Sequence, residues 1–219
     1  MSIFPAAMET ITEFLDHLHR SPKGRIVGPE EDQEQFLGHW GYTIYRTYYG
    51  PGSDEQWSKL LKNITDGVGK GLAELEEADK EPVAVTKARD QFRLDARSDL
   101  AILDELTLED VRQVYLEVSG GQPIRGTQRR NWGTFIFLLA DAQVLQDPDL
   151  RLLKVADARY DPVAAVPRNT RSGPQRNFGW LTIPTTAVLD FYDWMDRFTW
   201  EQIVNQAWPG KLWDPYEHK

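Results

Sequence analysis

The chain of 219 residues contains no cysteine. This absence excludes disulfide bonds, thiolate nucleophiles, and zinc or iron–sulfur sites that depend on cysteine. Long apolar runs are also missing, because no stretch approaches the ~20 residues that a membrane-spanning helix requires. The first residues lack the basic start and the apolar stretch of a secretory signal. We therefore expect a cytoplasmic protein that does not enter a membrane.

The familiar signatures of catalytic and metal sites are absent as well. The four histidines are scattered and form no His-Glu-x-x-His motif, so no metal site is predicted. No serine lies in a nucleophile elbow. The glycine-rich run 67–71 lacks the spacing of a phosphate-binding loop, and the sequence predicts no cofactor. Gly67, Gly69 and Gly71 instead indicate a break or a close backbone contact within a helix.

Positive charge is scarce overall but concentrated in one segment. The net charge of −9 argues against nucleic-acid binding, and no RNP-type aromatic motif favours RNA. Residues 119–177 nevertheless carry nine basic side chains against five acidic ones. The Pro- and Gly-rich stretch 159–177 has no periodicity, which is typical of a functional or disordered loop. It is either a solvated loop or a lid over an anionic small molecule, with Arg168 and Arg171 as the candidate ligand contacts.

The stretch 39–50 organises the predicted fold. It is dense in aromatic and β-branched residues and ends at a Gly-Pro-Gly turn, which is typical of a strand. Alternation places Tyr42, Arg46 and Tyr48 on one face of this strand. Arg46 is a fixed charge in an apolar setting, so its side chain must reach a carboxylate, a ligand or water.

Hydrophobic periodicity divides the rest of the chain into further elements. Ser53 and Thr107 are expected to cap two helices, each with a capping box. The order of the elements predicts an α+β protein with a ferredoxin-like sandwich, a mainly antiparallel sheet with helices on one face. We expect the other face to meet solvent, the terminal helices or a second copy of the chain. Helices are predicted over 7–19, 53–75, 107–118 and 188–203, and strands over 39–50, 91–97, 132–141 and 150–158.

The predicted domain organisation has three parts. Residues 1–37 form an N-terminal helix and a polar linker, residues 38–205 form a single α+β domain, and residues 206–219 form a tail rich in Trp and Pro. The N-terminal helix is amphipathic, so we expect it to dock on its own molecule rather than to serve as a partner-binding arm.

Residues 40–50 read Trp-Gly-Tyr-Thr-Ile-Tyr-Arg-Thr-Tyr-Tyr-Gly and are followed by Trp57 in the next predicted helix. This pattern resembles a large group of uncharacterised filamentous-fungal proteins that share a Trp-Gly-aromatic-x-Ile-Tyr-Arg-Thr/Cys-x-Tyr opening. Segments 135–141, 153–157 and 179–181 are also similar to that group. The resemblance covers most of residues 38–200. It implies a shared fold and an intracellular fungal setting, and it implies no activity.

The candidate site residues each have two interpretations. Arg46 is either half of a buried ion pair with Asp95, Asp141 or Asp157, or a clamp for a ligand carboxylate or phosphate. His39 at the strand entrance is the candidate general base, unless it is a solvated strand-end histidine. Several aromatic side chains either line a ligand pocket or belong to the core, namely Tyr42, Tyr48 and Trp57.

Two classes of function follow from these residues. The favoured one is a non-catalytic binding or interaction module, which holds an anionic small molecule near Arg46 or another protein on the open sheet face. The alternative is a cofactor-independent isomerase, cyclase or lyase that acts on an anionic or carbonyl-bearing metabolite. In that case Arg46 orients the substrate, His39 or Asp95 moves the proton, and the basic loop closes over both.

Overall fold

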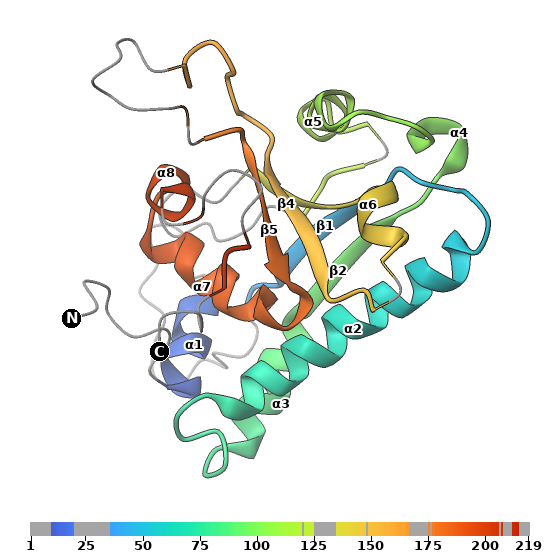
Figure 1. Cartoon of the computed structure of the whole chain (residues 1–219). Coiled ribbons are helices and arrows are strands. Elements are labelled where there is room, and N and C mark those ends of the chain that lie inside the picture. Colours follow the sequence, from blue (N-terminus) through green and yellow to red (C-terminus); the bar gives the residue numbers. More distant parts are fainter. Residues whose placement is uncertain are drawn as a thin grey trace.

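The computed structural model describes residues 10–19, 36–119, 121–124, 135–147, 149–166, 175, 177–205, 207 and 212–214. In this part of the chain, five strands form one sheet in the order β2-β1-β3-β4-β5 (Figure 1). The strands are β1 Trp40–Arg46, β2 Phe92–Arg97, β3 Ile136–Ala140, β4 Leu152–Asp157 and β5 Trp180–Pro184. The helices are α1 Ile11–Leu18, α2 Ser53–Glu74, α3 Pro82–Gln91, α4 Leu100–Leu103, α5 Leu108–Leu116, α6 Ala142–Leu145, the 3-10 helix η3 Thr185–Ala187, α7 Val188–Arg197 and α8 Trp200–Val204.

The sheet is mixed. β1 runs parallel to both β2 and β3, whereas β3 and β4 pair antiparallel, as do β4 and β5. The register places Thr43 opposite Asp95, and Lys154 opposite Thr182. The α+β class is therefore confirmed. The ferredoxin-like sandwich is not confirmed, because such a sandwich has an antiparallel sheet.

Helices cover both faces of the sheet. One core packs α1, α2, α3 and α7 against the face that carries Trp40 and Tyr42. A second core packs α4 and α5 against the other face, which carries Tyr45. Figure 1 shows the long helix α2 and the short helices α4 and α5 on opposite sides of the strands. The prediction that the helices over 53–75 and 107–118 share one face is therefore wrong.

The strand order gives the physical reason for this arrangement. The chain moves from β1 to β2 in one direction, and then from β2 past β1 to β3 in the other. Because crossovers between parallel strands are right-handed, opposite directions place the intervening helices on opposite faces. The sheet consequently has no open face over β1 and β3. The homodimer predicted through such a face loses its structural basis.

α2 is continuous through its three glycines, so the predicted break does not occur. The alternative, a close backbone contact, is confirmed at Gly67. A Cβ built on Gly67 would lie 2.8 Å from the carbonyl oxygen of Thr185 in η3. The glycine allows α2 to approach the backbone that leads into α7, and this contact holds the two main helices of the larger core together.

Both ends of the described chain pack into the larger core. The ring of Phe14 in α1 meets that of Trp40 edge to face, with centroids 4.9 Å apart. Near the other end, the backbone N–H of Trp213 donates to the carbonyl oxygen of Thr182, and the indole packs on Phe191 with centroids 5.2 Å apart. The prediction that the N-terminal helix docks on its own molecule is confirmed.

The predicted helix cap at Thr107 is also confirmed, because its side chain and that of Asp110 form a reciprocal capping box. The elements additional to the predicted ones include α3, α4, η3 and β5. Within the described ranges, no helix has the length and apolar character needed to cross a membrane.

Candidate functional site

Arg46 ends β1 at a corner where the chain turns into α2. Its side chain is 5% exposed, and its Nε donates to the carbonyl oxygen of Tyr48 at 3.0 Å. Nη2 donates to Ser53 Oγ at 2.7 Å and lies 2.6 Å from Asp54 Oδ1. The guanidinium also lies over the ring of Tyr49, 4.4 Å from the centroid. The guanidinium of Arg46 therefore has partners on several sides, and all of them come from residues 48–54.

This geometry supports the structural interpretation of Arg46 over the ligand clamp. Its carboxylate partner is Asp54, whose side chain is 94% exposed. The pair is buried on the guanidinium side only, so water reaches the carboxylate. The predicted partners across the sheet are wrong for this arginine, namely Asp95, Asp141 and Asp157.

Ser53 completes the corner. Its hydroxyl donates to the carbonyl oxygen of Gly50 at 2.6 Å while it accepts from Arg46. Ser53 is the first residue of α2, and Gly52, with φ at 76°, is the N-cap without a side-chain cap. The capping box predicted at Ser53 is therefore wrong, because the hydroxyl serves the turn instead of the helix.

Asp95 is fixed on the opposite face of the sheet. Its Oδ2 accepts hydrogen bonds from Thr43 Oγ1 at 3.0 Å and from Arg97 Nε at 2.9 Å. Arg97 also donates to the carbonyl oxygen of Ser119 at 3.3 Å. Two hydrogen bonds therefore fix the Asp95 carboxylate within the sheet, and its ion-pair partner is Arg97.

His39 is exposed just before β1. Arg46 lies at the far end of the same extended strand, which separates the two residues by roughly 20 Å at the rise of a β-strand. Asp95 lies beside Thr43, on the face that Arg46 does not share. The structure therefore does not bring together the three residues that the enzyme hypothesis requires.

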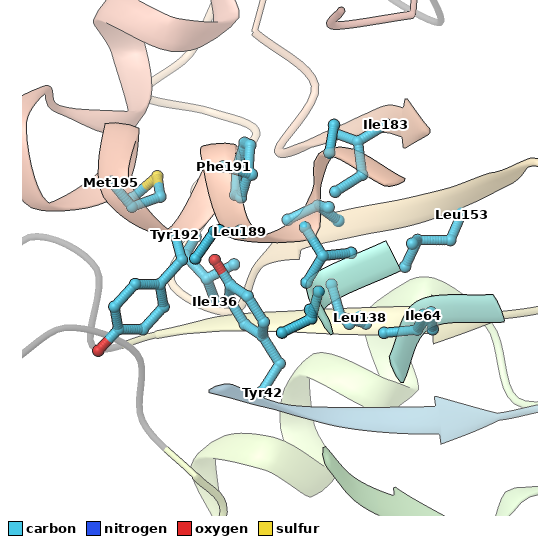
Figure 2. Packing of buried hydrophobic residues seen from close by; sticks show 14 of the residues in the cluster. Tyr42, Ile64, Ile136, Leu138, Leu153, Ile183, Leu189, Phe191, Tyr192 and Met195 are labelled. Atoms are coloured by element: carbon cyan, nitrogen blue, oxygen red, sulfur yellow. The ribbon is translucent and has the colours of Figure 1, made fainter. Parts of the chain in front are cut away.

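The aromatic candidates belong mainly to the core. Tyr42 is 1% exposed, and its hydroxyl has no hydrogen-bond partner among the described residues. Figure 2 shows Tyr42 reaching from β1 toward Leu189 and Tyr192 of α7. Burial raises the pKa of Tyr42 well above its usual value, and the nearby Tyr192 adds to the effect. Trp57 is also buried. Tyr48 is half-buried and accepts a hydrogen bond from Gln146 Nε2 at 3.1 Å.

The base of the predicted lid, residues 159–177, is tied to the domain. Arg112 of α5 is buried, and it donates from Nε to the carbonyl oxygen of Asp157 at 2.9 Å and from Nη2 to that of Gly179 at 2.9 Å. The Tyr160 hydroxyl donates to the carbonyl oxygen of Asn177 at 3.0 Å, which joins the two ends of the loop. The predicted ligand contacts Arg168 and Arg171 lie outside the described residues, so the lid stays a prediction.

A cavity of about 250 Å³ lies between α6 and the strands β4 and β5. It opens on the sheet face opposite the larger core, because Leu153 and Val155 of β4 point into that core while Lys154 lines the cavity. We call this cavity the α6–β5 pocket, and its walls are Gln143, Val144, Asp147, Leu152, Lys154, Thr182 and Leu212.

Lys154 in the wall of the α6–β5 pocket belongs to an ion pair. Lys154 Nζ donates to Asp141 Oδ2 at 2.5 Å, and their side chains are 15% and 26% exposed. Asp141 is held in place as the N-cap of α6, because its Oδ1 accepts from the backbone N–H of Val144 at 3.1 Å. The ammonium also lies over the indole of Trp180, 5.2 Å from the ring centroid. The Lys154 ammonium in the pocket wall is therefore held in position by Asp141 and Trp180.

Other polar groups of the pocket have donors or acceptors that are not used within the described part of the chain. Among the described residues, the side chains of Thr182 and Gln143 make no hydrogen bond. Asp147 accepts from the backbone N–H of Asp149 at 3.0 Å and makes no ion pair within the same ranges. Leu152 and Leu212 add apolar surface. A few unpaired polar groups beside apolar walls are typical of a small-molecule site.

None of the pocket residues belongs to the predicted ligand site. One signal was available for Lys154, since it is a charged residue between Leu153 and Val155 in an apolar strand, as Arg46 is in β1. The contribution of Thr182 and Leu212 depends on pairings between distant segments, which a single sequence does not reveal. Thr182 meets Lys154 across β4 and β5, and Leu212 bridges to Thr182 at the sheet edge.

The comparisons with known proteins identify no relative. No protein-family model, no curated protein and no solved structure matches the chain. The similarity to the fungal group therefore stays a prediction.

Proposed function

We propose that this protein is a non-catalytic binding module that holds a small polar molecule in the α6–β5 pocket. One observation carries the proposal. The pocket wall combines Lys154, which its ion pair with Asp141 holds in position, and polar side chains without hydrogen-bond partners in the described chain, Thr182 and Gln143. A ligand that fills such a pocket gains hydrogen bonds without breaking any within the protein.

The position of the pocket also supports this role. Its floor is the strand pair β4 and β5, and its rim includes Leu212 of the C-terminal segment. That segment is held by the hydrogen bond from Trp213 to Thr182 and by the packing of the Trp213 indole on Phe191 and Trp194. Sites on rigid elements hold a ligand with little ordering cost.

The enzyme alternative has less support. A cofactor-independent isomerase, cyclase or lyase requires an accessible base near a substrate anchor. Asp95 is paired with Arg97, Arg46 is enclosed by its corner, and His39 lies at the far end of β1. A non-catalytic module requires no such constellation, so we favour it.

A fragment screen read by ¹H–¹⁵N chemical shifts tests the proposal. Polar fragments of up to about eight heavy atoms should shift the backbone amides of Lys154, Thr182 and Leu212. Leu212→Trp fills the pocket and should abolish these shifts. Leu116→Trp is the matched control, because Leu116 lies exposed on α5, where the same change should have no effect. Hits that instead shift the Arg46 corner, or that bind both variants equally, would contradict the proposal.

A further inference from the structure

The electrostatics of the α6–β5 pocket select among possible ligands. Lys154 is the cation in the wall, and its charge is balanced by Asp141. The nearby Arg151 is exposed and pairs with Asp149 at 3.4 Å between Nη2 and Oδ2. The carboxylate of Asp147 also lines the pocket and has no cationic partner among the described residues. Among the described wall residues, the pocket therefore presents the unpaired carboxylate of Asp147 beside an ammonium, that of Lys154, whose charge Asp141 already balances.

We propose, on the basis of the binding function above, that the ligand is a small organic amine in its cationic form. Its ammonium group pairs with Asp147, and its short apolar chain lies against Leu152 and Leu212. The Thr182 hydroxyl accepts or donates one further hydrogen bond. An ammonium that meets a carboxylate in a half-buried setting makes a charge-assisted hydrogen bond, which is the strongest polar contact this pocket offers.

The proposed ligand carries a positive charge, whereas the sequence predicted a negatively charged one. Counted along the chain, the basic side chains of residues 119–177 favour an anion. Of the described ones, Arg159 lies over the ring of Phe135, and Arg151 is exposed and pairs with Asp149. An anion in the pocket meets Asp147 at close range and finds Lys154 already paired.

Three probes of equal length and different charge test the inference. n-Butylamine, n-butanol and butyrate are titrated at pH 7, with the amide shifts of Lys154, Thr182 and Leu212 as the readout. We expect n-butylamine to bind at least fivefold more tightly than n-butanol, and butyrate to bind most weakly. Added salt should weaken the binding of n-butylamine and leave that of n-butanol unchanged.

Asp147→Asn identifies the group responsible. The asparagine retains an oxygen that accepts from the backbone N–H of Asp149, so the local turn is preserved. The variant should lose about tenfold in affinity for n-butylamine and retain the affinity for n-butanol. Asp149→Asn is the matched control, because that carboxylate is exposed and outside the pocket wall, and it should change affinity less than twofold.

Each outcome separates the amine proposal from the broader function. If n-butanol or butyrate shifts the pocket amides and n-butylamine does not bind more tightly, the pocket is a binding site and the amine inference is wrong. An Asp147→Asn variant with unchanged affinity for n-butylamine also overturns the inference. If a fragment hit shifts the pocket amides and no probe does so at 50-fold the concentration that saturates that hit, only the amine inference is wrong. If the screen yields no hit and no probe shifts the pocket amides, both proposals fail.

Discussion

The guanidinium of Arg46 donates to the hydroxyl of Ser53 across 2.7 Å, and this hydrogen bond joins the end of β1 to the start of α2. Arg46→Ala leaves the carbonyl oxygen of Tyr48 and the Ser53 hydroxyl without their buried donor. We expect the free energy of unfolding to fall by about 3 kcal/mol, measured by urea denaturation.

Asp54→Asn is the control for this experiment. The Asp54 carboxylate is 94% exposed, so its loss should cost about 0.5 kcal/mol at most. A similar loss in both variants would show that the ion pair, and not the hydrogen-bonded corner, supplies the stability. An unchanged free energy of unfolding in Arg46→Ala would contradict the structural role and favour the ligand-clamp interpretation.

Gly67 and Gly69 of α2 should respond in opposite ways to alanine. Gly67→Ala places a Cβ 2.8 Å from the Thr185 carbonyl oxygen and 3.0 Å from Thr186 Cα, so it should destabilise the fold by about 1–3 kcal/mol. At Gly69 the nearest atom is 3.8 Å away, in the flexible side chain of Arg89. Gly69→Ala should therefore stabilise by up to about 1 kcal/mol through helix propensity. Thermal unfolding of the two variants decides the matter, and a stabilising Gly67→Ala would contradict the close contact of α2 with η3.

Two neighbouring aromatic residues of β1 should also differ. The Tyr42 hydroxyl is buried without a partner, so Tyr42→Phe should leave the free energy of unfolding unchanged or raise it by about 1 kcal/mol. Trp40 Nε1 donates to the carbonyl oxygen of Ala88 at 2.7 Å in the core. Trp40→Phe loses this bond and leaves a cavity, and should cost about 3 kcal/mol. A clear loss in Tyr42→Phe would mean that the hydroxyl has a partner, such as a buried water molecule.

Tyr49 should make stability depend on alkaline pH. Burial raises the pKa of the Tyr49 phenol to about 12, although the guanidinium of Arg46 opposes the shift. In the unfolded chain the pKa is about 10. The folded state therefore holds a proton that the unfolded state releases between these values, and the stability that Tyr49 contributes is present below pH ~10 and is lost as the pH rises toward ~12. Absorbance at 295 nm should show one ionisation near pH 12 that is absent in Tyr49→Phe. Identical titrations of the two proteins would contradict the assignment.

The local elements of this fold could be predicted from the sequence, whereas their arrangement could not. The observed bounds of α2, β2 and β4 are close to the predicted ones, and β1 and β3 lie within longer predicted ranges. β5 is five residues long and follows a Pro- and Gly-rich stretch, so its pattern is too short to stand out. The mixed strand order depends on which distant strands pair, and hydrophobic alternation is the same for parallel and antiparallel neighbours.

In the candidate site, too, local contacts could be predicted from the sequence, whereas contacts between distant segments could not. The need of Arg46 for a partner is apparent from its apolar strand, and the partner lies only eight residues away, at Asp54, because the chain reverses at the corner. The α6–β5 pocket, in contrast, is made by three segments that meet only in the folded state. Asp141 pairs with Lys154 across the β3–β4 turn, and Thr182 and Leu212 arrive from later in the chain.

The central claim is that the α6–β5 pocket is accessible and binds a small amine. The chain has no cysteine, so Thr182→Cys introduces a single thiol into the pocket wall, and Leu116→Cys introduces one on the exposed face of α5 as a control. The most direct measurement is the rate at which iodoacetamide labels each thiol, followed by mass spectrometry with and without n-butylamine. We predict that n-butylamine slows the labelling of the Thr182→Cys variant at least fivefold and leaves the Leu116→Cys variant unchanged. Equal rates with and without n-butylamine in both variants would contradict the claim.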